Sequence, residues 1–480
     1  MNRQSYPTYQ RVLDIFSELN RIPRPSHHEE RVADYLCSFA RQLNLDYERD
    51  AQNCVVIRKP ATPGYEASAP IVLLNHMDMV CVGMSDPIND PVQAYVENGW
   101  IKARGTSLGA DNGIGLSMAL AVLESDCIEH PALEVMTTTN EEDGMTGAAM
   151  LSDSYLIGRR VINLDSEDYD TITTGAAGAC LQLHRIPIKR TSVQNHNTAW
   201  YRIIIKGGLG GHSGVDINKG RCSAVIAAET VWSYLSQRYD TGVAMINVGE
   251  ANASIASMGQ MVITLPKDIP LSRLKDNMHD INGRLHCEYP CDAGIQCTIR
   301  ACHPQDTIIH PKVFVQMMEC LKRVPQGVIS MSKTMENTVE TSNNIGRIVT
   351  GNDHILISTH TRSFIDKDMT TLSRDIADTL SACGSISETV MSAPVWQEDR
   401  QSGFIQLTSN TFQDVLGWRP RMVAMHFVLE AGFFVQHFPG IQIASIGPRI
   451  LEPHSANERV ELKTIQDIWL VLLEMLSRLK

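Results

Sequence analysis

The sequence predicts an α/β fold with a mixed, largely parallel sheet flanked by helices, interrupted by an inserted α+β domain. Short apolar strands alternate with helical segments at both ends of the chain, a pattern typical of a sheet built mainly from parallel strands. At 480 residues the chain is too long for one ordinary core. The segment 191–199 is polar, as in a linker, and a different pattern follows it. We therefore expect one domain from 1–190 and 390–480 and an insertion at 191–389.

Composition limits the classes of partner. Hydrophobic residues make up 43% and charged residues 20% of the chain, as in soluble globular proteins. The formal net charge of −12 argues against nucleic acid or an anionic membrane as a partner. The N-terminus lacks the apolar stretch of a signal peptide, and the longest apolar run, 468–476, is too short to span a bilayer. The twelve cysteines show no zinc-finger spacing, so we expect reduced thiols and a cytoplasmic protein.

A helix is expected to begin near residue 26. Ser26 and Glu29 have the three-residue spacing of a capping box, which predicts Ser26 as the N-cap. Val32, Leu36 and Phe39 then follow on one helical face. An apolar strand comes later, at 71–75, and ends at His76. In extended backbone His76 and Asp78 point the same way, which suits a metal ligand and a carboxylate that orients it, although the pattern is weak alone.

A second strand, 133–139, runs into the acidic turn Glu141-Glu142-Asp143. A solvated turn and a cation-binding turn are both open for this segment alone. Three further polar residues lie at the end or the start of an apolar element: Asp111, Asp165 and His454. Asp111 could equally be a helix N-cap. Functional groups of parallel sheets gather at the carboxyl ends of the strands, so we expect these side chains to lie together.

The chemistry of this set favours a catalytic metal centre. Nitrogen and oxygen donors without thiolate suit hydrolytic Zn²⁺, while Mn²⁺ and Co²⁺ accept the same ligands. The candidates are too many for one tetrahedral ion with an open position. They suit two ions about 3.5–4 Å apart that share a carboxylate. One carboxylate then remains as a general base.

Two residues of the predicted insertion are further candidates. His212 lies in the glycine-rich loop 207–214, and Arg362 ends a strand at 354–361. A turn residue and a surface salt bridge are the simpler interpretations of these two side chains.

Five ordered motifs, together with their supporting segments, resemble the cocatalytic zinc peptidases of the aminoacylase/carboxypeptidase family, and more narrowly its aminoacyl-histidine dipeptidases. The motifs are His76-Met-Asp78, Gly109-Ala-Asp111-Asn112-Gly113, Glu141-Glu142-x-Gly144, Asn163-Leu-Asp165-Ser-Glu167 and Pro453-His454-Ser455. Each is weak alone, but together they run in order through nearly the whole chain. The resemblance implies a dizinc hydrolase of dipeptides, preferentially Xaa-His, that forms a homodimer through the inserted lid domain.

The resemblance also implies roles for single residues. His76 and Asp165 would hold one zinc ion, Glu142 and His454 the other, and Asp111 would bridge both. The Asp111–Asn112 peptide is typically cis in this family. Asp78 would orient His76. The remaining implied roles concern the substrate: Glu141 as general base, His212 as oxyanion donor reaching in from the partner subunit in many members, Arg362 as the ligand of the terminal carboxylate, and Glu430 as a substrate-binding group.

Three segments depart from the dipeptidase pattern. They contain Ser223, Ile255 and Val428, where the family usually shows Gly-x-Gly-Asn-Ala, Asn-Ala-Ile-Pro and His-Ala-Gly-Leu-Glu. The implied metal ligands are intact while segments implied to face the substrate differ. A general dipeptidase, an N-acyl amino-acid deacylase and a metal-binding paralogue without turnover therefore stay as alternatives.

Overall fold

The computed structural model describes residues 8–193 and 197–480, which form two compact units. Unit 1 holds the chain up to Ala176 together with Trp396–Ala424 and Leu429–Lys480. Unit 2 holds Ala177–Val395 and Met425–Val428. Among the described residues, no helix is long and apolar enough to cross a membrane.

The chain passes from unit 1 to unit 2 between Ala176 and Ala177, not in the linker that we expected. Strand β8 (Thr171–Ala176) ends unit 1, and β9 (Gly178–Pro187) already pairs with strands of unit 2. The predicted linker at 191–199 is wrong for the residues that are described. Arg190–Ser192 form strand β10, which pairs with β17 (Thr307–Ile309), and β11 begins at Thr198. Positions 194–196 of that segment lie outside the described residues. The polar composition of this segment suggested a linker because β10 is short and exposed and β11 begins with two half-buried residues.

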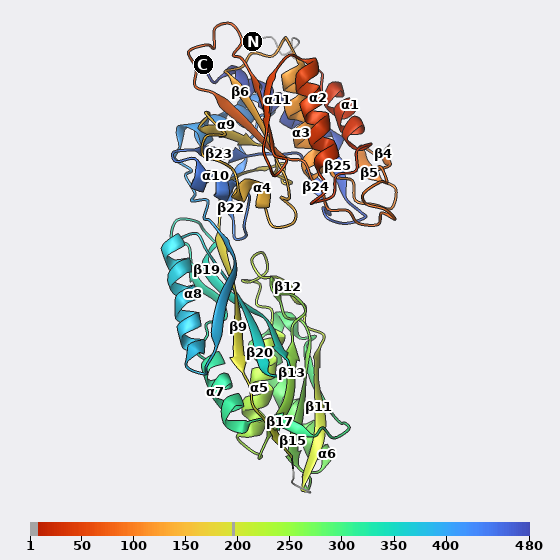
Figure 1. Cartoon of the computed structure of the whole chain (residues 1–480), viewed down its shortest axis with the longest axis vertical. Helices are drawn as coiled ribbons and strands as arrows, with labels where there is room; N and C mark the ends of the chain where they lie inside the picture. The colour runs from red at the N-terminus through yellow and green to blue at the C-terminus, as the bar shows by residue number, and fades with distance from the viewer. Residues whose placement is uncertain (1–7, 194–196) are drawn as a thin grey trace. The chain divides into compact units, whose positions relative to one another are not determined.

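Unit 1 is built on a sheet of eight strands (Figure 1). Its order is β1 (Asp46–Arg49), β2 (Val55–Lys59), β6 (Leu133–Thr138), β3 (Ile71–His76), β7 (Arg160–Asn163), β23 (Gln442–Ser445), β8 and β22 (Arg421–Met425). The four central strands, β6, β3, β7 and β23, are parallel, whereas β1, β2 and β8 pair in antiparallel fashion. The predicted α/β class with a mixed, largely parallel sheet is confirmed.

One continuous core covers a face of this sheet. Alternate strand residues such as Leu73 and Val135 pack with five helices: α1 (Gln10–Leu19), α2 (Glu30–Gln42), α3 (Ala110–Glu124), α9 (Gly403–Leu416) and α11 (Leu462–Ser477). Helix α3 is buried along almost its whole length, so apolar residues line all its sides. Two short helices, α4 (Thr146–Ala149) and α10 (Ala431–His437), and a four-stranded sheet complete the unit. That sheet has the order β24 (Ile450–Leu451), β25 (Arg459–Glu461), β5 (Trp100–Ala103) and β4 (Ala94–Glu97).

The predicted capping box at α2 is wrong. The helix begins at Glu30, and no side chain caps it. Ser26 instead donates its hydroxyl to Asp78 Oδ2 at 2.7 Å, and Glu29 Oε1 accepts the N–H of Asn140 at 2.9 Å. Both residues therefore support the loops that carry the polar candidates rather than their own helix.

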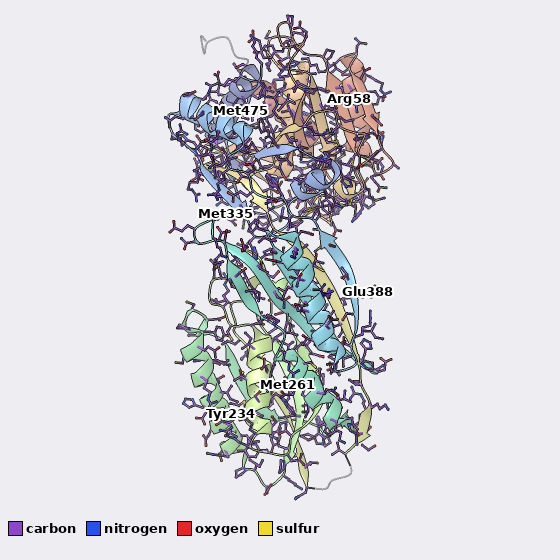
Figure 2. All side chains as sticks on the ribbon, turned by 90° about the vertical axis from the view of Figure 1, so that its left-hand side faces the viewer. Arg58, Tyr234, Met261, Met335, Glu388 and Met475 are labelled. Atoms are coloured by element: carbon purple, nitrogen blue, oxygen red, sulfur yellow. The ribbon has the colours of Figure 1, made fainter. Side chains whose placement is uncertain are left out.

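Unit 2 is an α+β structure with a long antiparallel sheet. The strand order is β16 (Gln296–Ala301), β11 (Thr198–Lys206), β15 (Gly259–Pro266), β13 (Gly242–Val248), β19 (Val339–Thr350), β20 (His354–Ser363), β9 and β21 (Ile386–Ala393), with β18 (Gly327–Met331) beside β19. Helices α5 (Ala224–Ser236), α6 (Leu271–Glu288), α7 (Pro311–Leu321) and α8 (Asp366–Ser381) pack with the strands in one core. Figure 2 labels Tyr234 on α5 and Met261 on β15 in this unit.

Candidate active site

The polar residues that follow the central strands of unit 1 lie at one edge of the sheet. Strand β3 pairs in parallel with β6, where His76 lies opposite Thr138, and with β7, where Leu74 lies opposite Asn163. Because the three strands run in the same direction, the segments that follow them emerge together. His76 ends β3, the glutamate turn follows β6, and Asp165 follows β7.

Asp111 lies between two histidines. Its Oδ1 is 3.0 Å from His76 Nε2, and its Oδ2 is 3.2 Å from His454 Nε2. Asp111 is the second residue of α3, and the Asp111–Asn112 peptide is cis, as the resemblance implied. Each oxygen of one carboxylate thus faces a different imidazole nitrogen.

Each imidazole also faces a carboxylate of its own. Asp165 Oδ1 lies 3.2 Å from His76 Nε2, and Glu142 Oε2 lies 2.8 Å from His454 Nε2. The Asn112 amide donates to Asp165 Oδ1 at 2.6 Å and to the Leu164 carbonyl oxygen at 2.8 Å, which fixes the Asp165 carboxylate. The structure therefore brings together the five residues that the sequence selects as ligands: His76, Asp111, Glu142, Asp165 and His454.

Glu167 is a sixth group in this cluster that sequence reasoning did not select. One of its carboxylate oxygens, one of Asp111 and a ring nitrogen of His454 all lie within 4.8 Å of one another. The signal was available, because Glu167 is two residues beyond Asp165 and residues with that spacing can share a side in extended backbone.

The electrostatics of the cluster fit divalent cations. Burial raises the pKa of Asp165 to about 6 and, with Asp111 beside it, that of Glu167 to about 9. Hydrogen bonds that His454 donates to the Asp111 and Glu142 carboxylates raise the pKa of its imidazole to about 11. Burial also raises the pKa of Glu142, whose buried Oε1 has no hydrogen-bond partner. Crowded carboxylates of this kind oppose one another's ionisation unless positive charge lies between them, so the donor set matches metal ions.

Asp78 contacts both the glutamate turn and the imidazole of His76. Its carboxylate is fully buried and accepts the backbone N–H of Glu141 at 3.1 Å and of Glu142 at 3.2 Å, besides the Ser26 hydroxyl. We expected the carboxylate to accept the other ring N–H of His76. In the structure His76 Nδ1 is nearer to the Asp78 backbone oxygen, at 3.1 Å, than to its Oδ1, at 3.5 Å. Either contact fixes the ring so that Nε2 faces Asp111 and Asp165.

Glu141 and Glu430 are buried acids beside this cluster that form no salt bridge with either imidazole among the described residues. Burial raises the pKa of Glu141 well above its ordinary value, and the charges of Asp165 and Glu430 add to the shift. Burial likewise raises the pKa of Glu430 to about 8, while a hydrogen bond with Thr138 lowers it. Glu430 belongs to unit 1, although His426 and Val428 of the same motif belong to unit 2.

Unit 2 contains a cluster of three histidines and one arginine: His212, His360, Arg362 and His426, called the imidazole cluster below. His212 Nδ1 accepts the backbone N–H groups of Gly214 and Val215, each at 3.1 Å. The neutral ring must then carry its proton on Nε2, where it can be donated. Burial and the Arg362 charge lower the pKa of His212 to about 4, which keeps the ring neutral at physiological pH.

Arg362 is buried without an anionic partner. The residue is 3% exposed, and Nη2 donates to Ser213 Oγ at 3.3 Å and lies 3.5 Å from His360 Nδ1. Its buried Nε has no hydrogen-bond partner among the described residues. Burial lowers its pKa to about 10. Within the described part of unit 2, no carboxylate pairs with it, so the surface salt bridge that we considered does not exist. A buried guanidinium in this state is suited to an anion supplied from outside the chain.

The three departures have structural roles in unit 2. Ser223 is the N-cap of α5, where its hydroxyl accepts the N–H of Val225 at 3.2 Å. Ile255 pairs with Gly211 in the short ladder of β12 (Gly211–His212) and β14 (Ser254–Ile255), which fixes the loop of His212. Val428 is the last residue of unit 2 before the chain returns to unit 1. Of the three, Ile255 thus shapes the surroundings of the imidazole cluster.

We predict that His184 of unit 2 makes folding sensitive to acid. Its ring is buried between the hydroxyls of Ser387 and Thr359, each at 2.8 Å, and burial lowers its pKa to about 4. As pH falls below the ordinary histidine value, the unfolded chain binds a proton that the folded chain refuses. The free energy of unfolding then decreases by at most about 1.4 kcal/mol per pH unit until about pH 4.

The His184→Gln variant isolates this contribution. Urea unfolding of wild type and variant from about pH 7.5 to about pH 5 should show that the stability advantage of wild type shrinks as pH falls. An advantage that is constant over this range contradicts the assignment.

The family follows from a comparison with known proteins. A model of the peptidase family M20/M25/M40 matches residues 72–478, a range that contains His76, Asp111, Glu142, Asp165, Glu167 and His454. The chain belongs to this family. It is therefore a hydrolase of the peptidase class, which confirms the predicted enzyme class and family.

Two relatives are similar along their whole length. The cytosol non-specific dipeptidase of Escherichia coli is 33% identical to this chain, and the alignment covers 100% of this chain and 99% of the relative. The crystal structure of aminoacylhistidine dipeptidase from Vibrio alginolyticus is 30% identical, with a TM-score of 0.88 and 99% of each chain covered. The aminopeptidase PepT of Bacillus cereus, at 17% identity and a TM-score of 0.61 over 98% of each chain, shares the fold.

Proposed function

We propose that this chain is a metal-dependent dipeptidase. The observation that carries the proposal is the position of Asp111, whose two oxygens face the Nε2 atoms of His76 and His454. A carboxylate between two histidines, each with a carboxylate of its own, suits two metal ions better than one. Zn²⁺ fits this set of nitrogen and oxygen donors, and Mn²⁺ or Co²⁺ would accept it too.

The proposed ligands follow the geometry. His76 and Asp165 hold one ion, His454 and Glu142 hold the other, and Asp111 is shared. Glu167 lies on the His454 side and offers a further carboxylate oxygen there. When bound, such a pair of ions polarises the scissile carbonyl and lowers the pKa of the attacking water.

Glu141 is the proposed general base. It is the buried acid of the turn that forms no salt bridge with His76 or His454 among the described residues, and Asp78 fixes its backbone. Its carboxylate would take a proton from the attacking water and deliver it to the nitrogen of the leaving amine, so that no charge is left on the amine.

The imidazole cluster of unit 2 is the proposed recognition site for substrate polar groups. Arg362 presents a planar, buried guanidinium without an anion, which suits the free carboxylate at the end of a dipeptide. His212 carries a proton on Nε2 and would donate it in a hydrogen bond to the carbonyl oxygen as negative charge develops there. Glu430 remains proposed as a substrate-binding group.

The substrate class is proposed from the relatives together with these groups. The Vibrio relative is named for aminoacylhistidine substrates and the Escherichia coli relative for non-specific dipeptides. We propose dipeptides, preferentially Xaa-His, as substrates, with general dipeptide cleavage as the second candidate. We further propose a homodimer formed through unit 2. A cytoplasmic location is in keeping with the name of the Escherichia coli relative and with the free cysteines of the described chain.

A substrate panel tests the proposal. Purified protein loaded with Zn²⁺ should hydrolyse β-alanyl-histidine and other Xaa-His dipeptides, and should lose activity when the terminal carboxylate is replaced by an amide. Equal rates on dipeptides with and without histidine would favour the general dipeptidase. Hydrolysis of N-acyl amino acids alone, or no turnover with metal bound, contradicts the proposal.

We predict that Arg362→Met raises KM for dipeptides and leaves kcat closer to the wild-type value. Loss of one partner of a buried charge pair costs about 2–5 kcal/mol, so kcat/KM should fall by about 30-fold or more. Thermal stability should stay the same or rise, because the variant no longer buries an unpaired charge.

The control for this variant is Arg185→Met, since Arg185 is an exposed arginine of β9, the strand beside β20. It should leave both KM and stability unchanged. A loss of stability in Arg362→Met with an unchanged KM would show that Arg362 is structural.

A further inference from the structure

One carboxylate closes the N-terminal end of the helix that carries Asp111. Helix α3 has Gly109 as its N-cap, and no local side chain caps it. Glu458 takes that place from the far end of the sequence. Its Oε2 accepts the N–H groups of Leu108 at 2.6 Å and Gly109 at 2.9 Å, and its Oε1 those of Ala110 at 2.8 Å and Asp111 at 3.4 Å. Such free N–H groups at a helix start favour an anion.

The same turn carries His454. Glu458 lies four residues after it, and the Glu458 N–H closes the turn by donating to the Ser455 oxygen at 3.2 Å. His454 Nε2 faces the Asp111 side chain, whereas Glu458 binds the Asp111 backbone. Asp111 is therefore contacted at both its side chain and its backbone by residues of a single turn, and movement of Glu458 would move His454 relative to Asp111.

Arg24 connects the opposite side of this helix start to β3. Its guanidinium is 1% exposed and donates to the carbonyl oxygens of Gly109 at 2.7 Å, Asp78 at 3.0 Å and Met77 at 3.1 Å. Gly109 has φ of 67°, and a Cβ atom there would lie 2.6 Å from Arg24 Nη2. Only glycine allows this approach. The segment after His76 and the segment before Asp111 are thus tied together.

We propose that Glu458 is a positioning residue of the metal centre, one that sets the place of His454 relative to Asp111, with Arg24 doing the same for His76. The proposal rests on the ligands assigned above. It differs from a plain helix cap in what is lost on mutation. A cap contributes to the stability of the fold, whereas a positioning residue also determines how tightly the folded protein binds metal.

The test compares Glu458→Gln with wild type and with Glu461→Gln. The glutamine keeps the size of the side chain but places an NH₂ group against backbone donors. Glu461 lies in the same segment and its carboxylate pairs with Arg449 at 3.1 Å, away from the backbone of α3, so it is a matched control. Zn²⁺ affinity is measured by competition with a chelator, and kcat and KM are measured at saturating Zn²⁺.

We expect at least one Zn²⁺ to bind about 10–100-fold more weakly in Glu458→Gln, as on loss of other groups that orient ligands. We also expect a lower kcat with little change in KM, and wild-type values for Glu461→Gln. If Glu458→Gln does not fold, Glu458→Asp, which keeps the charge on a shorter side chain, replaces it in the same comparison.

Two results would overturn the inference. One is a variant with lower thermal stability that binds both ions and turns over as wild type does. The other is an equal loss of Zn²⁺ affinity in Glu461→Gln. Failure of the wild-type protein itself to bind Zn²⁺ or to hydrolyse any dipeptide contradicts the proposed function instead, so the two failures are distinguishable.

Discussion

Glu141→Gln is expected to lower kcat by about 100- to 10,000-fold, the usual contribution of a general base, while both metal ions stay bound. The amide matches the carboxylate in size but cannot take a proton from the attacking water. Metal binding should survive because Glu141 forms no salt bridge with either imidazole among the described residues, whereas Glu142 faces His454 at 2.8 Å. The measurement combines steady-state hydrolysis of a dipeptide with the metal content of the same sample.

The neighbouring acid provides the control. Asp143 belongs to the same turn but is exposed, and its carboxylate lies 2.9 Å from His27 Nε2. Asp143→Asn should retain wild-type turnover. Loss of metal from Glu141→Gln would identify Glu141 as a ligand, and wild-type kcat in that variant would exclude it as the base.

Asp111→Asn is expected to abolish turnover by removing the shared ligand. The carboxylate of Asp111 presents one oxygen on the His76 side and one on the His454 side. The amide of asparagine has a single oxygen, so it cannot offer a metal-binding oxygen on both sides. At least one ion should be lost on dialysis, and the other should bind more weakly because a negative charge is gone. Asp165→Asn, which affects only the His76 side, should cause the smaller loss of metal.

The structure excludes the N-cap role, because Gly109 is the N-cap of α3. Metal analysis after dialysis, together with thermal unfolding, distinguishes the shared-ligand role from a purely structural role of Asp111 in the first turn of α3. Loss of a purely structural residue would lower stability without changing the metal content. Two ions retained by Asp111→Asn at wild-type affinity would contradict the shared-ligand assignment.

The gathering of these polar side chains could be predicted from the sequence because parallel strands impose a simple rule. His76, the glutamate turn and Asp165 all follow parallel strands, so any sheet that joins β6, β3 and β7 brings them together. The order of these strands in the sheet is not needed for that argument. Which of Glu141 and Glu142 faces His454 could not be deduced from two adjacent acids, and there the family resemblance supplied the assignment.

Long-range capping could not be predicted in the same way. Ser26 and Glu29 have the local spacing of a capping box, yet their side chains bond to Asp78 and to the Asn140 backbone. Conversely, the cap of α3 comes from Glu458, more than 300 residues away in the sequence. Local patterns report which side chains can bond to backbone N–H groups, whereas packing decides which groups come within reach. The unit boundary at Ala177 was missed for a similar reason, since β9 continues directly from β8 without a polar segment.

A metal titration of the wild-type protein tests most directly whether the chain is a dipeptidase that depends on two metal ions. The protein is stripped with a chelator, Zn²⁺ is added stepwise, and bound Zn²⁺ and dipeptide hydrolysis are measured in the same samples. We predict no hydrolysis without metal and a rise in rate that reaches its maximum as a second ion binds per chain. Full activity in the stripped protein, or two bound ions without turnover of any dipeptide, would contradict the proposed metal-dependent dipeptidase.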